Sequence, residues 1–375
     1  MTDVLIAGAG PAGAMAAIVL ARAGARVVVL DRARFPRPKL CGDTINPGAY
    51  AILQRLGLEV VAARAIPIDG MVVTGAEGVR VEGRYGDARG YAISRTDLDL
   101  ALLTAAAGAG ARIEQEALVD APIVDTAHGA SVSGVMVKGR NGRPLRMTAR
   151  VTIAADGRYS RVARALGLSR CPPRPRRWAI GSYFQDVAGL TPLGEMHIRR
   201  GHYLGVAPLP GGITNACVVT PRPTPGTPRD ILWKALRQDL QLRDRFTRAR
   251  MVVDPISLGP LAVDCAAVGI PGLLIAGDAA GFVDPMTGDG LRFAFRGAEL
   301  AALEAVRALE SGETDSHVRL AAARRREFTA KWRFNRTMRW MVEAPRTLRV
   351  AEIGAAVAPS VLQHIIRYAG DLHAA

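Results

Sequence analysis

The chain has 375 residues, of which 49% are hydrophobic and 22% are charged, and this composition excludes a disordered tail, a collagen, a coiled coil and a disulfide-stapled miniprotein. At this length we expect two domains, or one large domain with an additional lobe. The net charge of +15 favours anionic ligands.

The cysteines and the apolar runs exclude several further classes. Cys41, Cys171, Cys217 and Cys265 lie far apart and form no CxxC pair, so no metal site is predicted. A chain with a large core does not need disulfides, which favours a reduced, cytoplasmic setting. The sequence shows no signal peptide and no uninterrupted apolar run of about 18 residues, so no membrane-spanning helix is predicted.

The first thirty residues carry the sharpest local pattern. Val4–Ala7 predicts a short buried strand, and a GxGxxG turn follows at Gly8, Gly10 and Gly13, with Pro11 and Ala12 inside it. Residues 14–23 predict a helix, residues 27–30 a second buried strand, and Asp31 ends that strand. This βαβ unit with an acid about 20 residues beyond the glycines is typical of a dinucleotide site.

Each glycine of the turn has its own physical reason. Gly8 permits the tight turn, Gly10 lets the backbone approach a pyrophosphate, and Gly13 lets the helix pack closely on the strand. The free N–H groups at the helix N-terminus attract the phosphates. Asp31 is placed to accept a hydrogen bond from a ribose hydroxyl.

The next part of the chain changes its pattern twice. Residues 49–56 predict a helix, and short alternating strands with glycines between residues 66 and 91 indicate antiparallel sheet. A helix then opens at residues 94–99, where Thr96 and Asp99 have capping-box spacing. Further strands are predicted at residues 111–114, 130–137 and 147–153.

The second half alternates in the same way. A strand at residues 151–154 leads into the Asp156-Gly157 turn, and residues 178–261 mix strands with one polar helix at residues 228–244. A buried strand at residues 273–276 ends in Gly277-Asp278, and a long helix is predicted at residues 291–309.

Three signatures now stand in order: GxGxxG with Asp31, Asp156-Gly157, and Gly277-Asp278. Together they resemble the FAD-binding class that holds aromatic-ring hydroxylases, flavin halogenases and geranylgeranyl reductases. Two strings, residues 39–43 (KLCGD) and 277–290 (GDAAGFVDPMTGDG), are similar to the geranylgeranyl reductase branch.

The resemblance implies an α/β fold: a doubly wound, Rossmann-like FAD domain with an antiparallel β-sheet substrate lobe and C-terminal helices. The expected FAD-binding domain is discontinuous and comprises residues 1–65, 92–168 and 263–318. Residues 66–91 and 169–262 would form the substrate lobe, and residues 319–375 a C-terminal helical segment.

The resemblance also implies roles for individual residues. Arg32 would lie beside the adenosine, Arg95 would reach the pyrophosphate or ribityl chain, and Asp278 would bind ribityl hydroxyls. The Asp156-Gly157 turn would lie near the pyrophosphate and the nicotinamide donor. Backbone N–H groups between Pro285 and Leu291 would meet the flavin N1/O2 edge, where reduced flavin carries negative charge. The residues of this last segment assigned to the cofactor are Pro285, Gly288, Asp289, Gly290 and Leu291.

Structural alternatives to these roles stay open. Asp278 could cap the turn after its strand, Arg95 could be a surface residue, and Asp289 could be a solvated loop carboxylate. Cys41 lies on a loop that, by the resemblance, borders the substrate side of the flavin, and it is the candidate catalytic residue. A single cysteine can equally be a small buried hydrophobe.

One departure from the family pattern concerns the substrate lobe. Relatives often carry a Gly-Tyr-x-Trp strand, and the matching stretch at residues 201–208 has Gly205 at the tryptophan position. This departure argues against halogenation and predicts a roomier pocket over the flavin.

The segment from Arg319 to Arg349 is basic and carries interleaved aromatic and methionine residues. The preferred interpretation is a helix that packs its aromatic stripe on the FAD domain and leaves its arginines in water. The alternatives are a peripheral membrane contact or a dock for a carrier-linked substrate. No nucleic-acid reader motif accompanies the charge, so nucleic-acid binding is not expected.

The sequence thus predicts an FAD-dependent oxidoreductase, with two competing reactions. In the favoured one, NAD(P)H reduces FAD and O₂ serves to hydroxylate an apolar, aromatic or polyketide-like small molecule. In the alternative, reduced FAD saturates an isoprenoid double bond and Cys41 donates the proton. A non-catalytic flavin-binding protein is the third possibility.

Overall fold

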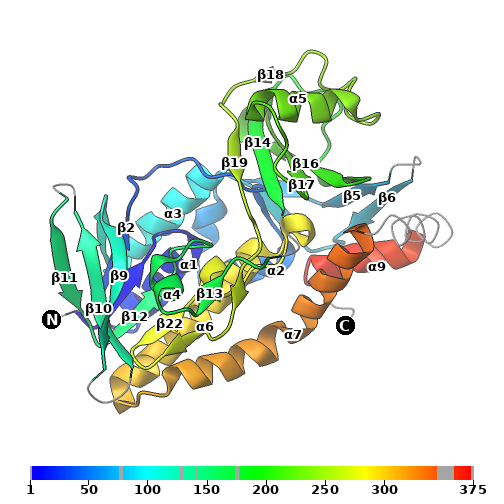
Figure 1. Cartoon of the computed structure of the whole chain (residues 1–375). Coiled ribbons are helices and arrows are strands. Elements are labelled where there is room, and N and C mark those ends of the chain that lie inside the picture. Colours follow the sequence, from blue (N-terminus) through cyan, green and yellow to red (C-terminus); the bar gives the residue numbers. More distant parts are fainter. Residues whose placement is uncertain are drawn as a thin grey trace.

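The computed structural model describes residues 2–75, 79–126, 130–139, 142–173, 177–343 and 359–372. Figure 1 shows a large α/β body that holds the N-terminus and, beside it, a second sheet that carries helix α5 (Pro228–Gln238). The long helix α7 (Ser316–Glu343) runs along the edge of the large body, and helix α9 (Pro359–Ala369) lies near the end of the second sheet.

The large body is built on a six-stranded sheet in the order β21-β22-β12-β1-β2-β8. All neighbours in it are parallel except the edge strand β21. Its strands are β1 (Val4–Ala7), β2 (Val27–Asp31), β8 (Arg112–Gln115), β12 (Val151–Ala154), β21 (Gly269–Ile270) and β22 (Leu273–Ile275).

Both faces of this sheet are covered, which explains why its central strands are continuous apolar runs. Helices α1 (Pro11–Arg22), α3 (Arg95–Gly108) and α6 (Gly290–Ser311) pack together on one face. The other face packs against a three-stranded sheet. That sheet consists of β9 (Leu118–Asp125), β10 (Ser131–Lys138) and β11 (Pro144–Thr148).

Two local predictions in this body were wrong. The strand predicted at residues 147–153 is two strands in different sheets, β11 and β12, because the chain turns at residues 149 and 150. The capping box lies two residues earlier than predicted: the Ser94 hydroxyl accepts a hydrogen bond from the Asp97 backbone N–H at 3.1 Å. Asp99 instead pairs with the side chain of Arg95.

The second sheet has the order β18-β14-β17-β16-β15-β5-β6, with β19 also paired to β14. It is antiparallel apart from the β15–β5 pair. Its strands are β5 (Gly70–Thr74), β6 (Arg80–Arg84), β14 (Trp178–Gln185), β15 (Leu193–Arg199), β16 (His202–Leu209), β17 (Ile213–Thr220), β18 (Arg250–Met251) and β19 (Ile256–Leu258).

Helix α5 covers the outer face of this sheet, where Leu232 and Leu236 pack on Phe184 and Phe246. The helix ends at Gln238, six residues before the end predicted from its polar pattern. On the inner face Tyr203 and Val219 pack toward the large body. The α/β fold class with an antiparallel second sheet and C-terminal helices is therefore confirmed.

Short elements complete the chain. A three-stranded sheet in the order β3-β7-β4 consists of β3 (Thr44–Ile45), β4 (Ile66–Ile68) and β7 (Gly90–Ala92). The remaining helices are α2 (Pro47–Arg55), α4 (Arg161–Ala165) and the 3₁₀ helices Glu59–Ala62, Pro210–Gly212, Gly277–Ala280 and Pro285–Thr287. β13 (Ser169–Arg170) pairs with β20 (Asp264–Cys265).

Helix α7 packs part of its aromatic stripe as predicted. Phe328 is buried in the main core, and Trp332 packs against it. Its basic side chains do not all lie in water, however, because Arg324 and Lys331 are buried. The predicted basic residues Arg346 and Arg349 lie outside the described residues. Within the described ranges, no helix combines the length and apolar character needed to cross a membrane.

Candidate active site

The turn at the end of β1 has the geometry of a phosphate cradle. Gly8 has φ +95°, a conformation that favours glycine, and a Cβ on Gly13 would overlap the carbonyl oxygen of Gly8. Asp31 holds the turn from β2, since its Oδ2 accepts a hydrogen bond from the Ala9 backbone N–H at 2.7 Å. Helix α1 begins at Pro11 and presents its N-terminus next to this turn.

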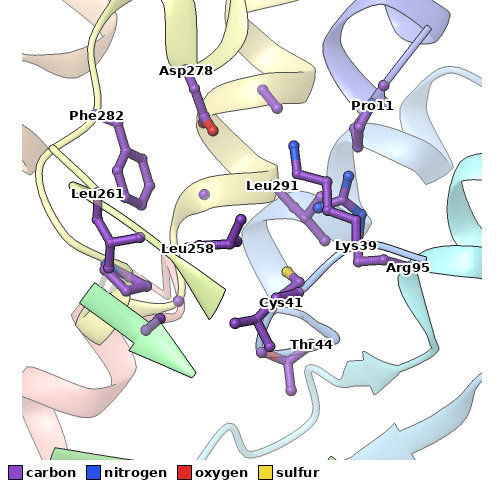
Figure 2. Close-up of a pocket in the computed structure, with 18 of the residues that line it drawn as sticks. Pro11, Lys39, Cys41, Thr44, Arg95, Leu258, Leu261, Asp278, Phe282 and Leu291 are labelled. Carbon is purple, nitrogen blue, oxygen red and sulfur yellow. The ribbon is translucent and has the colours of Figure 1, made fainter. Parts of the chain in front are cut away.

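A cavity of about 710 Å³ opens from this turn and continues between the two sheets. Its walls come from the Gly8–Ala12 turn, the loop at residues 37–42, the inner face of the second sheet, and helices α7 and α9. Figure 2 shows Lys39 and Arg95 on one side of the cavity and Leu258, Leu261 and Phe282 on the other. The Cys41 sulfur lies between them.

The structure brings nearly all sequence-predicted residues together around this cavity. The residues that line it are Gly8, Gly10, Pro11, Ala12, Asp31, Arg32, Cys41, Arg95, Asp156, Gly157, Gly277, Asp278, Pro285, Gly288, Gly290 and Leu291. Gly13 and Asp289 are outside the lining. Gly13 instead lies where α1 meets β1, as its predicted packing role requires.

Cationic side chains gather near the helix α1 N-terminus. Arg95 is buried, not a surface residue, and its Nε and Nη2 donate to the two carboxylate oxygens of Asp99 at 2.7 and 2.9 Å. Lys39 points into the cavity (Figure 2) and forms no hydrogen bond or ion pair within the described part of the chain. Burial and, to a smaller extent, the nearby charge of Arg95 lower the pKa of Lys39 to about 8, with Asp278 opposing them.

An unpaired ammonium in a basic cavity indicates that an anion belongs there. Sequence reasoning missed Lys39 as a site residue, although it stands in the KLCGD string. Among the described residues, Lys39 is the only lysine that lines the cavity.

The segment that precedes α6 forms another part of the cavity wall. Gly288 is left-handed with φ +68°, and α6 starts at Gly290 without a side-chain cap. Backbone N–H groups at this helix start are therefore left for a ligand on the cavity side, where Gly288, Gly290 and Leu291 form the wall.

Asp289 behaves differently from the solvated carboxylate considered above. It is only 1% exposed and points behind the helix start, where Asn46 donates to its Oδ1 at 3.2 Å and the Lys331 ammonium lies 3.4 Å away. Burial raises the pKa of Asp289 to about 6, against the opposing charge of Lys331.

This burial leads to a testable pH dependence. A carboxyl whose pKa is raised on folding contributes stability below its unfolded pKa of 3.8, and that contribution is lost as the pH rises through about 6. Asp289→Asn removes this pH-dependent loss of stability, because an asparagine side chain does not ionise. We expect the free energy of unfolding of the variant, relative to the parent, to rise by about 1 kcal/mol between pH 5 and pH 8. Denaturant titrations of both proteins measure it, and a pH-independent difference would contradict the assignment.

Away from the glycine turn and the start of α6, the cavity is lined mainly by apolar side chains. One wall is the inner face of the second sheet with its neighbouring loops, which contributes Leu258, Leu261 and Phe282. The other arm lies between β5, α7 and α9 and is lined by Met71, Val73, Phe334, Met338, Ile365 and Ile366. Such a surface accommodates a long apolar ligand.

Gly205 lies on the wall of this cavity, as expected from the missing tryptophan. A Cβ at Gly205 would already lie 3.1 Å from the Cys217 sulfur. The larger tryptophan side chain would therefore need Cys217 to move or would occupy the cavity itself.

The residues present fit FAD. The cavity offers a glycine cradle, a carboxylate at Asp31 beside it, an unpaired cation at Lys39, and a second open helix start at Gly290. No cluster of three or more metal-ligating side chains occurs among the described residues.

Comparisons with known proteins agree with this geometry. The family profile described as "FAD binding domain" matches residues 1–331. The chain is 33% identical to the menaquinone reductase of Mycobacterium tuberculosis, over 80% of this chain and 75% of the relative. It is 29% identical to the digeranylgeranylglycerophospholipid reductase of Methanoculleus marisnigri, over 88% and 81%. A crystal structure of a flavoprotein/dehydrogenase from Cytophaga hutchinsonii shares the fold, with a TM-score of 0.86 and 20% identity over 98% and 92%.

Proposed function

The chain belongs to the FAD-binding domain family and is an FAD-dependent oxidoreductase, and from this premise we propose that it saturates a carbon–carbon double bond in the isoprenoid chain of an apolar lipid. The observation that carries the proposal is the apolar arm of the cavity, which extends from the proposed flavin site to Ile366. Menaquinone and digeranylgeranyl lipids, the compounds in the relatives' names, both carry such chains.

The proposed reaction needs a hydride and a proton. FAD, when bound and reduced, supplies two electrons and one hydrogen to one carbon of the double bond. Cys41 supplies the proton to the other carbon, since its sulfur lies between the cationic wall and the apolar wall (Figure 2). The thiol becomes a thiolate, which the neighbouring Arg95 guanidinium stabilises.

We assign the cofactor-binding roles as follows. The Gly8–Gly13 turn, Lys39 and Arg95 hold the pyrophosphate, Asp31 holds the ribose, and Asp278 holds the ribityl chain. Residues 1–65, 92–168 and 263–318 bind FAD in this scheme, and residues 66–91 and 169–262 contribute the substrate lobe. NAD(P)H is the proposed donor, docking near the Asp156-Gly157 turn where Arg158 lines the cavity.

A lipid substrate would have to leave a membrane to reach this cavity, and we propose a peripheral contact for that purpose. Helices α7 and α9 both line the apolar arm. Each also exposes a large apolar side chain, with Trp340 59% and Val361 58% exposed. Such side chains next to an apolar arm suit insertion into the surface of a bilayer.

Hydroxylation, which the sequence alone favoured, is the second candidate. The space beside Gly205 supports it, because this space would admit a bulky ring. The preference moves to double-bond reduction because the reductase-named relatives align over most of the chain.

The test is an anaerobic half-reaction. The photoreduced holoprotein is mixed with a polyisoprenoid lipid, and the return of oxidised-flavin absorbance is followed. Reoxidation that requires the lipid supports the proposal. Reoxidation only after O₂ is admitted would favour hydroxylation.

A further inference from the structure

The Cys41 loop is held in a ring that Asn215 closes by hydrogen bonds to Cys41 and Asp43, with the backbone between these two residues completing it. Asn215 Nδ2 donates to the Cys41 carbonyl oxygen at 2.9 Å and to Asp43 Oδ2 at 2.6 Å. The other oxygen of Asp43 accepts the Arg95 backbone N–H at 3.1 Å. The Arg95 guanidinium lies near the Cys41 sulfur and interacts with it electrostatically. The backbone of Cys41 is therefore held by Asn215.

The ring ties the two bodies of the molecule together. Arg95 is the first residue of α3 in the large body, whereas Asn215 lies on β17 of the second sheet. Tyr183, on β14 of the same sheet, also lies next to Asp43. The position of the Cys41 loop is consequently set by the second sheet as well as by the FAD-binding body.

Asp43 takes part in this ring in an unfavourable backbone conformation. Its backbone φ is +54°, a left-handed conformation that a non-glycine residue rarely adopts, and the residue is only 1% exposed. Strained residues of this kind persist where the surrounding structure fixes them, and they concentrate at functional sites. Asp43 is absent from the cavity lining, so it acts on the cavity through the residues it holds.

We propose that Asp43, together with Asn215, is the positioning residue that sets the Cys41 thiol against the flavin and the substrate double bond. The assignment rests on the proposed double-bond reduction for its catalytic meaning. The ring itself is independent of which reaction the flavin performs.

The charge of Asp43 matters to this role. Burial raises the pKa of Asp43 to about 6, while the neighbouring Tyr183 and the hydrogen bond from Asn215 oppose the rise. The ionisable groups that face it are Arg95, Tyr183, Cys41 and Cys217. At pH 7.5 the carboxylate is ionised and accepts all its hydrogen bonds.

Asp43→Asn tests the proposal because it keeps the size of the side chain and changes one acceptor into a donor. The new amide N–H₂ would face either the Asn215 amide or the Arg95 backbone N–H, which are both donors. One side of the ring must open. Asp239→Asn is the matched control, since Asp239 is also buried and pairs with Arg199 at 2.6 Å, away from the Cys41 loop.

Two readouts are measured on the oxidised and reduced holoprotein at pH 7.5. The first is the rate of Cys41 alkylation by iodoacetamide, located by peptide mass. We expect at least a fivefold increase in Asp43→Asn and less than twofold change in Asp239→Asn. The second is single-turnover saturation of a polyisoprenoid lipid, expected to fall about tenfold in Asp43→Asn while reduction of the flavin by dithionite is unchanged.

Asn215→Ala provides a second route if Asp43→Asn does not fold. It should change both readouts in the same direction, since it removes the hydrogen bonds from Asn215 to the Cys41 carbonyl and to Asp43. Unchanged alkylation in both single variants would overturn the proposal, whatever their turnover. If the parent protein forms no saturated product, the proposed function fails, and the alkylation rates still decide whether Asp43 positions Cys41.

Discussion

Cys41→Ser is expected to slow saturation of the substrate double bond by about 100-fold or more, while reduction of the bound flavin by its donor stays within twofold of the parent. A positioned general acid contributes about 10²–10⁴ to a rate, and a serine hydroxyl is a far weaker acid than a thiol. Stopped-flow records of the reductive and oxidative half-reactions separate the two effects.

A matched control exists in the same chain. Cys265 is half-buried, and its thiol donates to the Ala267 carbonyl outside the cavity. Cys265→Ser should leave both half-reactions unchanged. A Cys41→Ser enzyme that saturates its substrate at the parent rate would remove Cys41 from the mechanism.

Gly13→Ala is expected to abolish stoichiometric FAD binding. The added Cβ would overlap the Gly8 carbonyl oxygen, and that oxygen belongs to a turn whose own geometry is fixed by the neighbouring Ala155-Asp156 backbone. Overpacking against side chains costs about 1–3 kcal/mol, and backbone atoms yield less readily. The flavin-to-protein ratio after gel filtration should fall at least tenfold, and Tm should fall by about 5 °C or more.

Gly108→Ala is the control for adding a methyl group to a glycine. Gly108 lies at the end of α3, and a Cβ there would meet no atom within 4 Å. Its FAD content and Tm should match or exceed those of the parent. Full FAD occupancy in Gly13→Ala would show that the cradle is not the binding element.

Local patterns were enough to predict residues that the structure brings together around one cavity. The glycine turn, the Asp31 position and the Gly277-Asp278 strand end each depend on a few consecutive residues, and all of them line or support one cavity. Short continuous apolar runs likewise predicted the buried strands β1 and β2.

Contacts between distant parts of the chain could not be predicted in this way. Asp43 and Asn215 are 172 positions apart, and nothing near either residue indicates that they share a hydrogen bond. The apolar arm depends on Phe334 and Ile366 lining the same cavity, which requires the placement of α7 and α9. For the same reason the sequence did not single out Lys39, and it left Asp289 open between a cofactor role and a solvated carboxylate, whereas Asn46 and Lys331 contact it in the structure.

The most direct test of the account is the mass of the product. The holoprotein, a reductant and a polyisoprenoid lipid are incubated once under strictly anaerobic conditions and once under ¹⁸O₂. The proposed reduction predicts a product heavier by two hydrogens, formed without oxygen and free of ¹⁸O. A product that forms only in the presence of O₂ and carries ¹⁸O would contradict double-bond reduction and establish hydroxylation.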